Sequence, residues 1–283
     1  MRWLRQKRRR KVLFFLLFAL GLYLAMCLVL ARNYLHPWVP TAVRPPYLSV
    51  AKGGPEGTWV GGNPDAKAVF VLIHGYGANQ EFWTPLAAEL LERGHAVVIP
   101  AMPGHGLRGH DKTTFGHEES QVAVEAGRMA RADFPHARVV LVGCSMGGAA
   151  AWLASERAPA VFDAVATEGA YARFDEAMSW WFERKMRGAS ITLRPVIWFA
   201  TWSSGLTPSD IVPMDSARKW RGRPALVIQA EDDRLILRSH ADRLAEAAGC
   251  ELWLVPGARH AGVQEAALEE YADRLAAMLE SGI

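Results

Sequence analysis

Short apolar runs alternate with amphipathic stretches from residue 67 to the end of the chain, and this alternation restricts the fold more than any other feature. The apolar runs are rich in Val and Ile and are bounded by Gly or Pro, which is typical of strands buried on both faces. They predict strands at 68–74, 96–102, 138–143, 161–167, 224–230 and 251–256, and residues 47–62 could add one or two antiparallel strands. The stretches between them predict helices at 80–93, 118–133, 146–157, 239–248 and 262–280. The order implies an α/β protein with a mostly parallel central sheet and helices on both faces.

The N-terminal part carries a second strong signal, an apolar run over residues 12–31 without a charged side chain. As a helix, this run matches the hydrocarbon core of a bilayer, about 30 Å thick. The apolar region of a signal peptide is usually shorter, about 7–15 residues, so we expect an uncleaved transmembrane signal anchor, with a cleaved signal peptide as the alternative. Residues 1–11 contain seven Lys and Arg and no acid, and such a tail stays in the cytoplasm. We therefore expect the rest of the chain outside, on the periplasmic side of a bacterial inner membrane.

Residues 32–46 contain four prolines, which predicts a semi-rigid extended linker that lifts the following domain, residues 47–283, off the membrane. Outside the basic tail the chain has 25 basic and 29 acidic residues. This mildly acidic balance argues against a nucleic-acid partner.

A lone serine stands where the strand 138–143 meets the next helix, in the run Gly143-Cys144-Ser145-Met146-Gly147. A sharp strand-to-helix turn exposes such a hydroxyl and strains the serine backbone. Glycines two residues before and after are needed because the turn brings these positions together. The pattern therefore indicates a nucleophile, with an incidental serine in a glycine turn as the alternative.

A serine hydroxyl becomes a nucleophile when a histidine takes its proton and a carboxylate orients that histidine. Only His240 and His260 follow Ser145, and His240 lies at a predicted helix start, where we expect it to be solvated. His260 follows the last strand, which puts it at the same edge of the sheet as Ser145. The acid candidates follow the strand 224–230 and are Glu231, Asp232 and Asp233.

The loop after the first of these strands reads His74-Gly75-Tyr76-Gly77. Acyl transfer requires preorganised donors for the developing oxyanion, and we expect the N–H groups of Tyr76 and Met146 to supply them, with His74 structural. Residues 104–109 match G-x-G-x-x-G, but a polar loop follows instead of the helix that a dinucleotide site needs. The sequence also has no Walker motif, no H-E-x-x-H and no C-x-x-C, so we expect no cofactor and no metal.

These segments resemble the α/β-hydrolase fold serine hydrolases, the esterases and lipases, over about residues 47–283. The resemblance rests on His-Gly-x-Gly at 74–77, Gly-His-Gly at 104–106, the serine turn at 143–147 and Gly-x-x-His at 257–260. The family's acid often lies in G-x-x-D-x-x-V. That register matches residues 230–236, with Ala230 in place of the glycine, and selects Asp233 over Asp232. The resemblance implies an α/β-hydrolase fold and a Ser145–His260–Asp233 triad.

Residues 171–223 break the alternation, at the place where the resemblance implies a small helical cap over the active site. We expect Trp181, Trp198 and Trp202 to form an acyl-binding wall, with packing of the cap onto the sheet as the alternative. Basic residues that would approach anionic headgroups are interleaved with them at Arg184, Lys185, Arg187 and Arg194.

The expected function is hydrolysis of carboxylic esters through an acyl-enzyme, with lipid-like and medium-chain acyl esters as the candidate substrates. Thioesters and amides, including aminopeptidase substrates, are alternatives on the same fold, because a fold does not determine its substrate. A non-catalytic binding module tethered to the membrane is a third hypothesis, although all three triad roles are present. The expected partners are a small-molecule or lipid ester and, through residues 12–31, the membrane.

Overall fold

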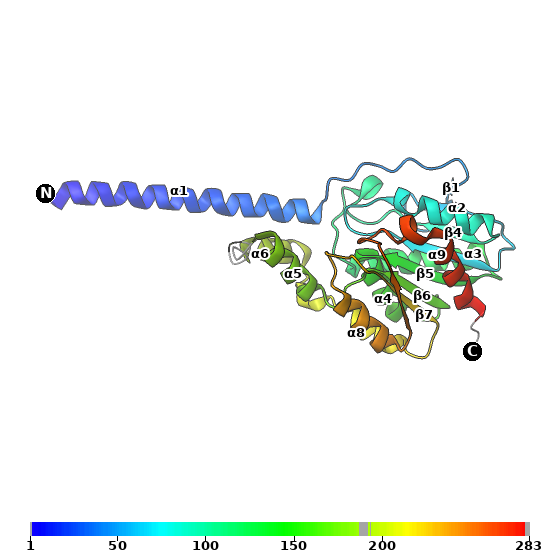
Figure 1. The fold of residues 1–283 in the computed structure, drawn as a ribbon. Coiled ribbons are helices and arrows are strands. Elements are labelled where there is room, and N and C mark those ends of the chain that lie inside the picture. Colours follow the sequence, from blue (N-terminus) through cyan, green and yellow to red (C-terminus); the bar gives the residue numbers. More distant parts are fainter. Residues whose placement is uncertain (1, 187–191, 193, 281–283) are drawn as a thin grey trace.

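An eight-stranded sheet forms the centre of the molecule in the computed structural model, which describes residues 2–186, 192 and 194–280 (Figure 1). The strand order is β1-β2-β4-β3-β5-β6-β7-β8. Strands β1 and β2 pair in antiparallel fashion, and β3 to β8 run parallel. The strands are β1 (Ser49–Val50), β2 (Trp59–Gly61), β3 (Ala68–Ile73), β4 (Ala96–Ile99), β5 (Arg138–Cys144), β6 (Ala164–Glu168), β7 (Ala225–Ala230) and β8 (Glu251–Val255). The predicted mostly parallel sheet with an antiparallel start is confirmed.

Helices cover both faces of this sheet. One face carries α2 (Thr84–Glu92) and α9 (Val263–Glu280), and the other carries α3 (His117–Asp133), α4 (Met146–Arg157), α7 (Pro213–Trp220) and α8 (Arg238–Ala248). Alternate strand residues serve the two cores: Val69 and Val71 belong to one, Phe70 and Leu72 to the other. The central strands are buried on both faces for this reason, which explains their continuous apolar sequences.

A few element ends differ from the sequence-based expectation. The strand expected at 96–102 stops at Ile99 because Pro100 has no N–H for the ladder. The helix expected at 80–93 begins as a 3-10 turn, η1 (Gln80–Trp83), capped by the side chain of Asn79. The glycine-rich segment after β4 continues as another 3-10 turn, η2 (Gly106–Arg108).

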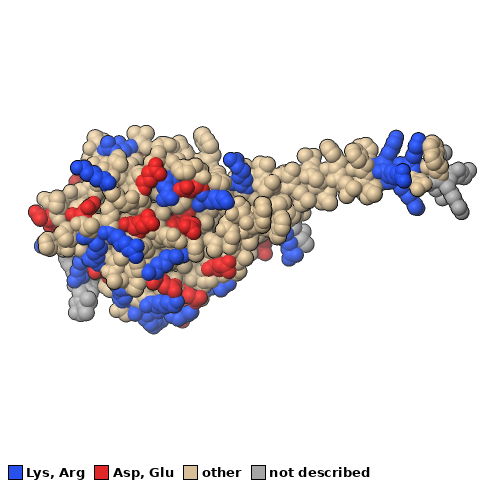
Figure 2. Space-filling view, turned by 180° about the vertical axis from the view of Figure 1, so that it is seen from behind, with Lys and Arg blue, Asp and Glu red and all other residues tan. Residues whose placement is uncertain are grey.

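The N-terminal residues form one long helix, α1 (Arg2–Leu35), that projects from the body (Figure 1). By length and composition α1 can cross a bilayer, a property that a signal sequence near the N-terminus would share. Charged side chains gather at its tip and over the globular body, and the middle of the helix shows none (Figure 2).

The segment after α1 lies against the domain. The Leu35 carbonyl accepts the N–H of Thr113 at 2.8 Å. The Pro40 carbonyl accepts the side-chain amide of Asn79 at 3.3 Å. The segment expected as a linker is therefore not separate from the domain, because carbonyl groups at both of these positions have partners on the domain surface.

The irregular interval between β6 and β7 contains two kinds of element. Helices α5 (Phe174–Met186) and α6 (Arg194–Ser204) and the 3-10 turn η4 (Pro208–Asp210) stand beyond the sheet, and α6 packs along α1 (Figure 1). Helix α7, in contrast, packs between α4 and α8. We refer to α5, α6 and η4 as the cap, which is shorter than the expected insertion over 171–223.

Candidate active site

Ser145 occupies the sharp turn between β5 and α4. Its φ of 55° is a strained value for a residue with a side chain. A Cβ on Gly143 would lie 2.2 Å from the carbonyl oxygen of Gly147, and one on Gly147 would lie 2.2 Å from that of Ile73. The two glycines therefore allow the close approach that projects the serine hydroxyl from the carboxyl edge of the sheet.

His260 and Asp233 form a hydrogen-bonded chain with Ser145. The Nε2 atom of His260 lies 3.0 Å from Ser145 Oγ, and its Nδ1 atom lies 2.6 Å from Asp233 Oδ2. The three residues follow β5, β7 and β8, whose carboxyl ends share one edge because the strands are parallel. The structure thus brings Ser145 and His260 together with one of the three acid candidates, the Asp233 that the family resemblance implies.

The second carboxylate oxygen of Asp233 is also held. Its Oδ1 atom accepts the N–H groups of Leu235 at 2.8 Å and Ile236 at 2.9 Å. The Asp233 side chain is 1% exposed, whereas Glu231 and Asp232 lie on the surface. Of the three acids in this loop, the structure puts Asp233 against the histidine, as the sequence register indicates.

The loop after β3 lies beside the serine. A Cβ on Gly75 would lie 3.1 Å from Ser145 Cβ. Tyr76 and Met146 border the same cavity as Ser145. An oxyanion hole made from the N–H groups of Tyr76 and Met146 requires that both residues lie beside Ser145, as they do here.

Three further histidines near this edge are buried. His105 Nε2 accepts the N–H of Gly77 at 3.0 Å, which fixes the loop after β3. Burial lowers the pKa of His74 to about 3, so this imidazole is neutral at physiological pH. His240 Nδ1 accepts the N–H of Ala172 at 3.2 Å. The prediction of a solvated His240 is wrong, because this residue lies on the inner face of α8.

A buried carboxylic acid, Glu168, lies next to the triad. It ends β6, its carbonyl accepts the Ser145 N–H at 2.7 Å, and its Oε1 atom accepts the Val263 N–H at 3.2 Å. Burial raises the pKa of Glu168 to about 7. Sequence analysis missed this residue, although an acid at the carboxyl end of a predicted strand is a usable signal.

An apolar cavity of about 210 Å³ opens beside Ser145. Its walls come from the last turn of α1, from α5 and α6, and from loops at the sheet edge. Tyr34 and Leu35 of α1 line it together with Val196 and Thr201 of α6. Sequence analysis missed Tyr34 and Leu35, because nothing in the pattern connects the end of the N-terminal apolar helix with a serine more than a hundred residues away.

The expected tryptophan wall is present only in part. Trp181 lines the cavity, but Trp198 and Trp202 are 61% and 71% exposed and do not line it. The two are four residues apart and share the outer face of α6, while the inner face carries Val196 and Thr201. Among the interleaved basic residues, Arg187 and the side chain of Lys185 lie outside the described part of the chain.

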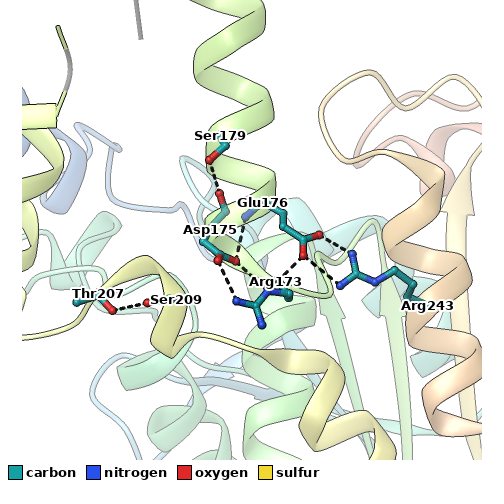
Figure 3. Close-up of polar contacts among 7 residues, drawn as sticks. All are labelled: Arg173, Asp175, Glu176, Ser179, Thr207, Ser209 and Arg243. Atoms are coloured by element: carbon teal, nitrogen blue, oxygen red, sulfur yellow. Dashed lines mark hydrogen bonds and ion pairs between the residues drawn. The ribbon is translucent and has the colours of Figure 1, made fainter. Parts of the chain in front are cut away.

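Charged contacts hold the base of the cap (Figure 3). Arg173 pairs with Asp175 at 2.9 Å and with Glu176 at 3.2 Å, at the first turn of α5. Arg243 of α8 approaches Glu176 from the other side, with Nη2 3.3 Å from Oε1. Such partly exposed pairs contribute about 0–1 kcal/mol each, so their role is to orient α5 on the body.

Comparison with known proteins agrees with this fold. The sequence model of the alpha/beta hydrolase family matches residues 70–274. An esterase of Pyrococcus furiosus has a similar structure, with a TM-score of 0.68 and 17% identity over 87% of this chain and 98% of that one. A 2-hydroxy-6-oxo-6-phenylhexa-2,4-dienoate hydrolase from Rhodococcus has a TM-score of 0.59 and 19% identity, covering 83% of this chain and 100% of that one.

The esterase domain of a Rhodothermus marinus protein has a TM-score of 0.54 and 19% identity, over 78% of this chain and 90% of that one. A sequence comparison with curated proteins finds no match. The family model covers most of the chain and spans the serine turn, the acid loop and the histidine loop. The chain therefore belongs to the alpha/beta hydrolase family.

Proposed function

We propose that this hydrolase cleaves carboxylic esters with Ser145, His260 and Asp233 as its catalytic triad. The observation that carries the proposal is the unbroken hydrogen-bonded chain from Ser145 Oγ through the His260 ring to Asp233. In the proposed reaction, His260 takes the proton of Ser145 as the serine oxygen attacks the acyl carbon. Asp233 orients the ring and stabilises its positive charge.

The N–H groups of Tyr76 and Met146 then hold the oxyanion. The ester C–O bond breaks, the alcohol leaves with the proton from His260, and an acyl-enzyme remains. Water attacks this intermediate, with His260 again as the base, and releases the acid. The position of Gly75 against Ser145 supports this oxyanion assignment.

The acyl group would occupy the apolar cavity beside Ser145. Its lining by Phe182, Val196 and Leu35 supports a medium-chain acyl group over acetyl. Each buried methylene contributes about 0.8 kcal/mol, so the rate should rise about fourfold per carbon until the cavity is full. Thioesters with the same acyl chain would fit this cavity equally well.

The membrane would lie close to this cavity. We propose that α1 is a single-pass anchor with its basic N-terminus in the cytoplasm and the hydrolase domain outside. Helix α6 packs on the end of α1, and its outer Trp198 and Trp202 would then face the bilayer surface, where tryptophan is favoured. Protease added to intact spheroplasts should digest the domain, and protection until lysis would mean the opposite orientation.

A fluorophosphonate probe tests the central assignment, because it labels only an activated serine. The full-length protein in detergent should be labelled and should hydrolyse p-nitrophenyl octanoate. Ser145→Ala should lose both properties, with a drop in rate of at least about 10⁴-fold and an unchanged circular dichroism spectrum. Absence of labelling in the folded wild type would favour the non-catalytic binding module instead.

A further inference from the structure

A second hollow borders the proposed triad on the side of His260. Three arginines line it: Arg184 at the end of α5, Arg234 in the acid loop and Arg259 directly before His260. We call this hollow the arginine groove. Among the described residues that line it, Asp232 is the one acid, so the arginines give the groove a positive charge.

The guanidinium groups of this groove are free to bind a ligand. Arg184, Arg234 and Arg259 are exposed, and within the part of the chain that the structure describes none of them forms an ion pair or a hydrogen bond with its side chain. Arginines at the base of the cap are engaged in contrast, as Arg173 and Arg243 are with Glu176. The reaction proposed above does not use the three groove arginines.

The arginine groove and the apolar cavity meet at the reacting residues. Trp181 and Leu235 line both hollows. Ser145 faces the apolar cavity, whereas His260 faces the groove. A substrate bound across this boundary would have its acyl chain on the serine side and the remainder of the molecule in the groove.

The proposed reaction places the alcohol part of the ester in the arginine groove. When the ester C–O bond breaks, the leaving oxygen takes its proton from His260 Nε2, so the alcohol must depart on the histidine side. Guanidinium groups bind phosphate and carboxylate through paired, charge-assisted hydrogen bonds.

We propose that the arginine groove binds an anionic group carried by the alcohol part of the substrate. The substrate class is then a single-chain acyl ester of a phosphorylated or carboxylated alcohol. This inference rests on the proposed function and narrows its substrate.

Two esters with the same acyl chain test the inference: monooctanoylglycerol and its phosphate ester, both as soluble monomers. The measured quantity is the preference, the kcat/KM for the phosphate ester divided by that for the neutral ester. Full-length wild type should prefer the phosphate ester about tenfold or more at low ionic strength, and about 0.5 M salt should reduce the preference because exposed charges are screened.

Arg234→Gln and Arg259→Gln should each reduce the preference about three- to tenfold, and the double variant should reduce it further. Arg128→Gln on α3 is the matched control, an exposed arginine away from the groove, and should keep the wild-type preference. Using a ratio cancels any general loss of rate that a change next to His260 causes.

A second arm identifies the source of the anion, with the long-chain phosphate and neutral esters embedded in phosphatidylcholine vesicles. A preference in vesicles that the double variant loses would identify a lipid headgroup. A preference for soluble monomers alone would identify a soluble phosphate ester.

Equal rates for both esters in both arms, or a preference that the double variant retains, would overturn the inference. The proposed function would survive that result, since Ser145-dependent hydrolysis of the neutral ester would persist. Failure to cleave either ester, together with absent fluorophosphonate labelling, would overturn both.

Discussion

The carboxyl edge of the sheet and the cap with the neighbouring helix α1 are built in different ways. At the edge, the candidate catalytic residues follow buried parallel strands, and main-chain N–H groups fix Asp233. The cap instead contacts α1 through a small apolar cluster around Cys27, Ala31 and Val196. Short local segments therefore define the proposed chemistry, while packing between distant segments defines the space for the substrate.

The largest expected loss of activity comes from changing the acid at the sheet edge, Asp233. Asp233→Asn should lower kcat about 10³- to 10⁴-fold for every ester, because the amide favours the wrong histidine tautomer. Asp232→Asn is the matched control, one residue away and exposed, and should stay within about twofold of wild type. Steady-state kinetics measures both variants. If Asp232→Asn lost activity and Asp233→Asn kept it, the catalytic acid would be Asp232.

A smaller loss is expected at the proposed oxyanion loop. Tyr76→Pro removes one N–H donor and should lower kcat about 10²- to 10³-fold. The hydroxyl of Tyr76 also donates to the Tyr34 carbonyl at 3.1 Å, so Tyr76→Phe serves as the control that keeps the N–H. Equal losses in both variants would mean that the side chain, and not the N–H, matters.

The buried carboxyl group of Glu168 should lower the free energy of unfolding at neutral pH, and the pH dependence of stability tests this. Burial raises its pKa to about 7 in the folded state, from an ordinary value of 4.5 that applies to the unfolded chain. Between these pH values the unfolded chain is ionised while the folded chain keeps its proton, so stability falls as pH rises from about 4.5 to 7 and stays reduced above that.

Glu168→Gln cannot ionise and keeps an acceptor for the Val263 N–H. Relative to wild type, it should gain about 1–3 kcal/mol in unfolding free energy between pH 4 and pH 8. Urea denaturation at the two pH values measures this gain, with the exposed Glu231→Gln as control. Parallel pH profiles for wild type and Glu168→Gln would show that the acid is ionised in the folded protein.

The sequence predicted the sheet edge well and the cap poorly, for a physical reason. Gly143, Ser145 and Gly147 specify a turn through backbone sterics that involve only near neighbours and one adjacent strand. Which face of α6 turns inward depends on α1, and the helical pattern alone did not indicate that Trp198 and Trp202 lie outside. His240 likewise became interpretable only once the packing around α8 was known.

The most direct test of the account compares octanoate with acetate esters in three variants. Thr201→Trp on the inner face of α6 should fill the apolar cavity, while Trp202→Ala on the outer face is its control. Asp233→Asn reports on the chemistry alone. The quantity is the ratio of kcat/KM for p-nitrophenyl octanoate to that for p-nitrophenyl acetate, measured with the full-length protein in detergent.

We predict that Thr201→Trp lowers this ratio at least about tenfold, since a filled cavity loses several buried methylenes, each contributing about 0.8 kcal/mol. Asp233→Asn should slow the hydrolysis of both esters and leave the ratio unchanged. Trp202→Ala should alter neither the rates nor the ratio. A ratio that falls in Asp233→Asn, or stays at the wild-type value in Thr201→Trp, would contradict the proposed division between a sheet edge that performs the chemistry and a cap and helix α1 that hold the acyl chain.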